Sequence, residues 1–177
     1  MSQYGEIYDK VFSEHSGYQN PIGSPGFRLC LQNQQRLMNL GPHHLDYGSG
    51  AGFAVELMRS HLFRKESYGV DVSAKMAASA NARIGAEVIH LLENGRAPFP
   101  NDTFDLVTCF DVLEHLDPPD IFATRDEIQR VLKPDFRTGN LRLGSKRAYT
   151  IGPFTCAMKS GQATTIRCLL FSYSRLA

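Results

Sequence analysis

The chain has 177 residues, of which 42% are hydrophobic and 21% charged, and its formal net charge is +1. This length suits one domain or slightly more, and the hydrophobic content is sufficient for a sizeable core. A net charge so close to zero gives no general attraction to nucleic acid or to an anionic membrane.

The first forty residues contain two amphipathic segments separated by a loop. In residues 4–12, Tyr4, Ile7, Tyr8 and Val11 recur at helical spacing. We interpret this segment as a short helix that lies on the domain, with a lid over a ligand as the alternative. Residues 17–26 are rich in turn formers and predict a loop. The apolar spacing of residues 27–40 predicts a second helix, which glycine and proline end at positions 41 and 42.

A glycine-rich turn follows a short apolar run that contains Leu45, Asp46 and Tyr47. Its glycines alternate at Gly48, Gly50 and Gly52, and an amphipathic helix begins directly after them. A strand, a glycine-rich turn and a helix are how an open α/β sheet builds a nucleotide site. Glycine is required where the backbone turns with positive φ or approaches a ligand closely. A tight turn without a ligand is the alternative interpretation.

A second short strand, residues 68–72, carries an acid near its end. Asp71 lies 19 residues beyond Gly52, and a carboxylate there can accept hydrogen bonds from both hydroxyls of a bound ribose. The alternative role for Asp71 is the N-cap of the next helix, although Ser73 could provide that cap instead. With the glycine turn upstream, we expect the ribose role.

The remaining pattern repeats strand and helix. We expect a helix at residues 73–83, a third strand at 86–92, a fourth at 104–110 and a helix at 120–132. The fourth strand is almost continuously apolar, which is typical of a strand buried on both faces of a parallel sheet. Four alternations with short connections predict the α/β class, with a doubly wound, mostly parallel sheet.

Five segments in order resemble the class I S-adenosylmethionine-dependent methyltransferases, most closely the subgroup called methyltransferase domain 11. They are residues 45–52, 69–73, 97–107, 112–116 and 130–134. The resemblance implies a Rossmann-like methyltransferase fold, S-adenosyl-L-methionine as cofactor and transfer of a methyl group to a small-molecule acceptor. The glycine pattern is G-x-G-x-G, with Phe53 where a dinucleotide site has its third glycine. That difference separates the chain from a nicotinamide dehydrogenase.

The resemblance also implies cofactor roles for single residues. Asp46 would orient the glycine turn and reach the methionyl amine, directly or through water. The glycine backbone would contact the methionyl part, and Asp71 would hold the ribose. Glu93, where the family usually has aspartate, would face the adenine amino group. The implied cofactor residues are Asp46, Gly48, Ser49, Gly50, Gly52, Asp71, Val72, Glu93, Asn94, Phe110 and Asp111, and no metal is implied.

Two histidines are candidates for a general base. His115 stands at a matched motif position, and we interpret it as a structural histidine with general base as the alternative. His15 is a second candidate if the N-terminal segment folds over the site. In-line methyl transfer depends mainly on positioning, and it needs a base only when the acceptor must lose a proton.

The likeness ends after Pro134. Residues 137–147 contain four basic residues and no acid, and no Asp or Glu follows Asp135. Strands are conceivable at residues 140–143, 148–151 and 169–173. Two interpretations remain: a divergent section that completes the sheet, or a tail foreign to the fold that leaves the sheet incomplete at its C-terminal edge. With a foreign tail, the protein would be a catalytically silent relative that at most binds the cofactor.

These patterns divide the chain into an N-terminal helical or lid segment (1–40), a cofactor-binding core (41–134) and an atypical tail (135–177). The four cysteines, at positions 30, 109, 156 and 168, show no C-x-x-C spacing, which favours reduced thiols over a disulfide framework or a zinc site. No signal peptide or apolar span of membrane length is visible. We therefore expect a cytoplasmic protein whose partner is a small-molecule acceptor, without nucleic acid or membrane.

Overall fold

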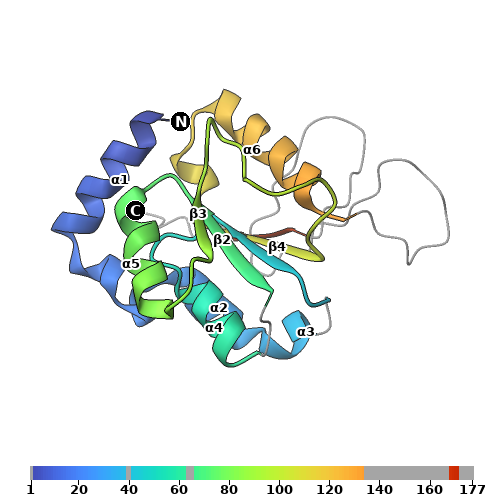
Figure 1. Ribbon diagram of the computed structural model, residues 1–177. Helices are drawn as coiled ribbons and strands as arrows, with labels where there is room; N and C mark the ends of the chain where they lie inside the picture. Colours follow the sequence, from blue (N-terminus) through green and yellow to red (C-terminus); the bar gives the residue numbers. More distant parts are fainter. Residues whose placement is uncertain (1, 39–40, 63–65, 134–167, 172–177) are drawn as a thin grey trace.

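The computed structural model describes residues 2–38, 41–62, 66–133 and 168–171 (Figure 1). Its centre is a five-stranded sheet with the order β3-β2-β1-β4-β5, and every pair of neighbouring strands is parallel. The strands are β1 (His44–Tyr47), β2 (Ser67–Asp71), β3 (Ile89–Leu91), β4 (Leu106–Phe110) and β5 (Cys168–Phe171). The expected doubly wound α/β sheet is confirmed.

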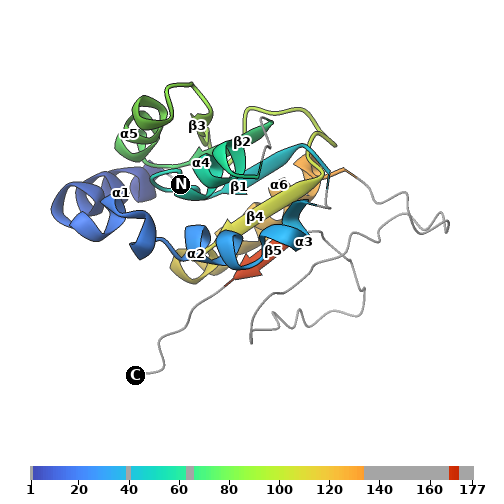
Figure 2. The same cartoon turned by 90° about the horizontal axis from the view of Figure 1, so that it is seen from below.

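Helices cover both faces of this sheet (Figures 1 and 2). They are α1 (Ser2–Glu14), α2 (Pro25–Gln32), α3 (Gln34–Met38), α4 (Phe53–Ser60), α5 (Ala74–Ile84) and α6 (Pro118–Val131). Alternate residues of β1 point to opposite faces, so Leu45 and Tyr47 pack with Ile128 and Val131 of α6. The other face is covered by α2, α4 and α5, whose buried residues form two further apolar clusters. Within the described chain, no helix is both long enough and apolar enough to cross a bilayer.

The N-terminal helices differ from the predicted pattern. The expected helix over residues 27–40 is two helices, because Asn33 leaves helical geometry between them at φ −111° and ψ 16°. Helix α2 also begins two residues earlier than expected, since the Ser24 hydroxyl caps it by accepting from Phe27 N. The expected loop before it contains two short 3₁₀ turns, Ser16–Gln19 and Pro21–Gly23.

Two strands are shorter than predicted because other groups take their backbone hydrogen bonds. The side-chain oxygen of Asn81 accepts from the amides of Val88 and Ile89, so β3 begins only at Ile89. Before β4, Phe104 bonds through its backbone to the end of α6 rather than to the sheet. The strand therefore starts at Leu106.

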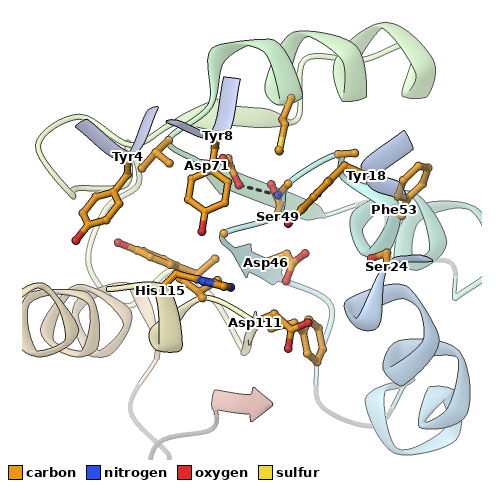
Figure 3. Close-up of a pocket in the computed structure, with 18 of the residues that line it drawn as sticks. Tyr4, Tyr8, Tyr18, Ser24, Asp46, Ser49, Phe53, Asp71, Asp111 and His115 are labelled. Carbon is orange, nitrogen blue, oxygen red and sulfur yellow. Dashed lines mark hydrogen bonds between the residues drawn. The ribbon is translucent and has the colours of Figure 1, made fainter. Parts of the chain in front are cut away.

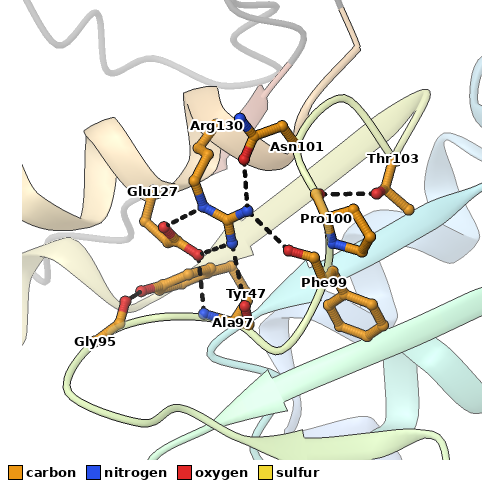
Figure 4. Close-up of polar contacts among 9 residues, drawn as sticks. All are labelled: Tyr47, Gly95, Ala97, Phe99, Pro100, Asn101, Thr103, Glu127 and Arg130. Atoms are coloured by element: carbon orange, nitrogen blue, oxygen red, sulfur yellow. Dashed lines mark hydrogen bonds and ion pairs between the residues drawn. The ribbon is translucent and has the colours of Figure 1, made fainter.

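An ion pair on α6 fastens the connection between β3 and β4 (Figure 4). Arg130 pairs with Glu127 and donates to the carbonyl oxygens of Ala97 and Phe99 and to the side chain of Asn101. Glu127 accepts from the Ala97 amide at 2.9 Å. We call the Arg130–Glu127 pair and its hydrogen bonds the clamp. It holds the start of residues 97–107, the third family-like segment, against the end of α6.

The described part of the tail extends the sheet. Strand β5 lies beside β4 with Thr108 opposite Leu169 (Figure 2). It overlaps the expected strand at residues 169–173, whose last two positions lie outside the described residues. The other expected strands, residues 140–143 and 148–151, and the basic run at 137–147 also lie outside them.

Candidate functional site

A cavity of about 690 Å³ opens at the carboxyl ends of β1, β2 and β4 (Figure 3). The chain moves outward from β1 to β3 and then returns to the other side of β1 as β4. Such a switch point is where an open parallel sheet offers a crevice for a ligand. The cavity volume lies within the usual range for small-molecule sites.

The turn after β1 forms the floor of this cavity. Gly48 has φ +75°, and a Cβ there would overlap the side chain of Val112, so only glycine fits both the backbone and the space. Gly52 has φ +72° and caps α4, where a Cβ would lie 2.8 Å from the Cβ of Ala80. The predicted strand, glycine turn and helix are thus present, with Gly48, Ser49 and Gly50 lining the cavity.

Asp71, at the end of β2, joins the glycine turn to the start of α5. Its Oδ2 accepts from Gly50 N at 2.7 Å, and its Oδ1 accepts from Ser73 N at 2.9 Å. Burial raises the pKa of this carboxyl group, although these backbone donors oppose the shift. Ser73, rather than Asp71, caps α5 by accepting from Met76 N. The Asp71 carboxylate is therefore not needed as the cap of α5, and it lies in the cavity wall at the end of β2.

Asp46 is the deepest acid of the site, with only 3% of its surface exposed. The hydroxyl of Thr108, directly opposite on β4, donates to its Oδ1 at 2.6 Å. Burial raises the pKa of Asp46 to about 7; the Thr108 hydrogen bond opposes this rise and nearby Asp71 adds to it. The site therefore contains a carboxyl group that changes charge near neutral pH.

Two further polar side chains stand in the cavity wall. Asp111, just after β4, has a left-handed backbone at φ +49°, which non-glycine residues seldom adopt and which is common at functional sites. The Ser49 hydroxyl is buried and has no hydrogen-bond partner within the described ranges. A buried hydroxyl of this kind is costly unless something satisfies it.

Helix α1 closes one side of the cavity with aromatic rings (Figure 3). Tyr4 and Tyr8 face inward, and the Tyr8 ring meets the edge of His115 at a centroid distance of 6.2 Å. Asp9 fixes the helix in place, since its Oδ1 accepts from the Ser73 hydroxyl and from Lys75 N. The N-terminal helix thus lies on the domain and lines the cavity, and its role as a lid over a ligand stays a prediction.

The structure brings most of the predicted cofactor residues together. Besides Gly48 and Gly50, six of them line the cavity and three do not. Asp46, Ser49, Asp71, Val72, Phe110 and Asp111 are in the lining, whereas Gly52, Glu93 and Asn94 are not. Gly52 packs beneath the turn, and the other two form an exposed turn after β3, where Leu92 is the lining residue. Their cofactor contacts stay predictions.

The two histidine candidates separate clearly. His115 lines the cavity on the side of α1, whereas His15 follows the end of α1 and is exposed outside the lining. The residue pattern did not single out several lining residues: Tyr18, Ser24, Arg28, Met76, Leu92 and Thr124. Only turn composition marked residues 17–26, and no motif there indicated contact with the site.

In the described part of the chain, no three His, Cys, Asp or Glu side chains cluster as metal ligands would. Cys30 and Cys109 are buried free thiols. The polar side chains in the cavity lining are carboxylates, tyrosines, serine and threonine hydroxyls, a histidine and an arginine around a glycine turn. Such a set suits an organic ligand that carries positive charge and hydroxyl groups.

Comparison with known families gives one match, to the methyltransferase domain, over residues 45–137 or just over half of the chain. A curated relative, the uncharacterized methyltransferase YcgJ of Bacillus subtilis (strain 168), is 34% identical over 99 residues. The aligned region covers 52% of this chain and 37% of YcgJ. The chain therefore spans well under two thirds of the length of this relative.

Solved structures are also similar to this chain. An S-adenosylmethionine-dependent methyltransferase from Aquifex aeolicus is 27% identical, with 63% of each chain covered and a TM-score of 0.47. CalS10 from Micromonospora echinaspora, an amino pentose methyltransferase solved with bound S-adenosylmethionine, is 20% identical with a TM-score of 0.54. That likeness covers 72% of this chain and 52% of CalS10 and concerns the fold alone.

Proposed function

This chain belongs to the class I S-adenosylmethionine-dependent methyltransferases, and we propose that it transfers the methyl group of S-adenosyl-L-methionine to a small-molecule acceptor bound in the cavity described above. The observation that carries the proposal is the meeting of the glycine turn with Asp46, Asp71 and Asp111 at the switch point of the sheet. We also propose the reducing cytoplasm as its compartment, in keeping with the free thiols of Cys30 and Cys109.

The residues fit the cofactor by charge and by hydrogen bonding. The cofactor carries a sulfonium, an ammonium and two ribose hydroxyls. The site offers three carboxyl groups and the buried Ser49 hydroxyl, which has no partner among the residues that the structure describes. We assign the ribose to Asp71 and the ammonium to Asp46. Each carboxylate oxygen has two lone pairs, so Asp71 can keep its bonds to Gly50 and Ser73 and still accept from a ribose.

When bound, the cofactor supplies an activated methyl group whose transfer neutralises the sulfonium. The protein contributes position: the carboxyl groups hold one reactant, and the side of the cavity formed by Tyr4, Tyr8 and His115 is left for the acceptor. If the acceptor is a hydroxyl or an amine that must lose a proton, His115 on that side of the cavity is the candidate general base. An acceptor that is already nucleophilic needs no base.

Titration with S-adenosylhomocysteine tests the proposal. We expect a measurable dissociation constant in the native chain and a loss of about 1–3 kcal/mol of binding free energy in Asp71→Ala, because charge-assisted hydrogen bonds are lost. Asp126→Ala on the exposed face of α6 is the control and should bind normally. No heat and no thermal shift at millimolar ligand would refute cofactor binding. Unchanged affinity in Asp71→Ala would reject its ribose role.

A further inference from the structure

A buried hydrogen-bond chain runs beneath the site, on the face of the sheet covered by α2 and α4. The Nδ1 of His44 lies 2.7 Å from the hydroxyl of Ser67, and its Nε2 lies 2.9 Å from the hydroxyl of Thr108. Thr108 in turn donates to Asp46. All three residues that lead to Asp46 are completely buried.

Strand register creates this chain. Ser67 is the partner of His44 across β1 and β2, and Thr108 is the partner of Asp46 across β1 and β4. His44 and Asp46 are two residues apart on one strand and so share a face. Polar side chains on three neighbouring strands therefore meet where the rest of this face is apolar, with Ala54, Leu57 and Met58 of α4 packed over it.

The direction of the bonds follows from counting protons. The single Thr108 proton goes to Asp46, so the Thr108 oxygen must accept from His44 Nε2. A neutral imidazole then has Nδ1 as its acceptor, and the Ser67 hydroxyl donates to it. The chain thus runs one way, from Ser67 through His44 and Thr108 to Asp46.

We propose that His44 and Thr108 are positioning residues for cofactor binding: their one-way hydrogen-bond chain directs the Thr108 proton at Asp46 and so keeps this carboxylate ionised and oriented toward the methionyl ammonium. The inference rests on the proposed function, because it assigns Asp46 to that ammonium. If instead a proton sat on Asp46, its hydroxyl would donate to Thr108 and the whole chain would reverse. The two directions therefore correspond to the two charge states of Asp46.

Other groups around Asp46 act on the same equilibrium. Asp71 at the end of β2 disfavours its ionised form by like charge, and Asp111 after β4 and the cationic Arg28 of α2 line the same cavity. Cys30 of α2 is a buried neutral thiol whose pKa is raised, first by burial and then by Asp46 itself. The hydrogen bond that Thr108 donates favours the ionised carboxylate, because it lowers the pKa of Asp46 against the effect of burial.

The first test is the pH dependence of S-adenosylhomocysteine affinity between pH 5.5 and 8.5. In the native chain, affinity should rise with pH through a midpoint near 7. Thr108→Val, which keeps the shape but loses the hydroxyl, should move the midpoint upward by about one unit and weaken binding at pH 7 by about fivefold. Thr108→Ser should restore the native profile. Thr103→Val, which loses a hydroxyl at an exposed turn, is the control.

A second measurement needs no variant and no ligand. Long-range ¹H–¹⁵N correlation spectra should show His44 as the neutral Nε2–H tautomer at pH 8, where Asp46 is ionised; the Nδ1–H tautomer would overturn the inference. A native chain that binds, with a Thr108→Val profile that does not shift, would overturn this inference alone. Absence of ligand binding at every pH would overturn the proposed function and, with it, the role given to Asp46.

Discussion

Asp46 combines a cost in stability with a proposed role in binding. Because its pKa is about 7 in the folded chain and near 4 when unfolded, the folded state holds the proton more tightly between these values. The contribution of Asp46 to the free energy of unfolding is thus most favourable below about pH 4, and it declines as the pH rises to 7. Asp46→Asn should therefore raise the free energy of unfolding by roughly 3–4 kcal/mol at pH 8, while weakening S-adenosylhomocysteine binding.

Urea unfolding at pH 5 and pH 8 checks this prediction. At pH 5 the folded carboxyl group is still protonated while the unfolded one is already largely ionised, so the gain should fall to about 1–2 kcal/mol. An equal gain at both values would show that the charge of Asp46 is not the cause. Such a gain in stability at the expense of function is common when a strained or desolvated site residue is replaced.

At this scale, sequence spacing identified the residues whose role follows from a contiguous turn. Gly48, Asp46 and Asp71 sit where the strand, glycine turn and acid pattern placed them. Tyr18 and Arg28 reach the cavity only through the docking of distant segments, which no local pattern reveals. The chain from Ser67 to Asp46 was equally hidden, because it depends on strand register.

Among the elements, the contact between the glycine turn and α5 can be isolated with two matched substitutions. Gly52 and Gly85 have almost the same backbone, at φ +72° and +73°. A Cβ at Gly85 meets nothing within 4 Å, whereas one at Gly52 meets Ala80 and Ile89. Gly85→Ala should cost about 1–2 kcal/mol through backbone strain, and Gly52→Ala should cost about 1–3 kcal/mol more through overpacking.

Denaturant unfolding gives both values, and ligand titration should show weaker cofactor binding for Gly52→Ala only. Equal costs for the two substitutions would mean that α5 moves freely away from the turn. That result would contradict close packing as the reason for glycine at position 52.

The clamp on α6 offers a second prediction for an element. Arg130 is 16% exposed and donates to three groups of the β3–β4 connection in addition to pairing with Glu127. Lysine cannot reproduce this planar set of donors. Arg130→Lys should lower the free energy of unfolding by about 2–3 kcal/mol, toward the lower end of the cost of breaking a buried pair.

Arg125→Lys on the same helix is the matched control, since the Arg125 pair with Asp126 is partly exposed and should be worth under about 1 kcal/mol. Thermal unfolding of both variants measures the difference. Similar losses would indicate that helix propensity, rather than the clamp, sets the effect.

For the whole molecule, the order of strands and helices was predictable because buried parallel strands and amphipathic helices differ in period. The exact ends of the strands were not predictable from the sequence, because Asn81 and the end of α6 supply competing hydrogen bonds. The tail followed no family pattern. Its described strand, β5, nevertheless pairs with β4, which favours a tail that takes part in the sheet.

Helix α1 joins the two halves of the molecule across the cavity. The Tyr4 hydroxyl donates to the carboxylate of Asp117 and accepts from its amide at the start of α6, and Asp9 accepts from Ser73 and Lys75 at the start of α5. At about 1 kcal/mol for each net hydrogen bond lost, the double variant Tyr4→Phe/Asp9→Ala, which removes the Tyr4 hydroxyl and the Asp9 acceptor, should loosen this wall. We expect S-adenosylhomocysteine to dissociate about tenfold faster, measured by stopped flow.

The control is Lys10→Ala, which removes an exposed pair with Glu14 on the same helix, so the ligand should dissociate from this variant at the native rate. If the double variant releases the ligand at the native rate, α1 covers the cavity without retaining what is bound there.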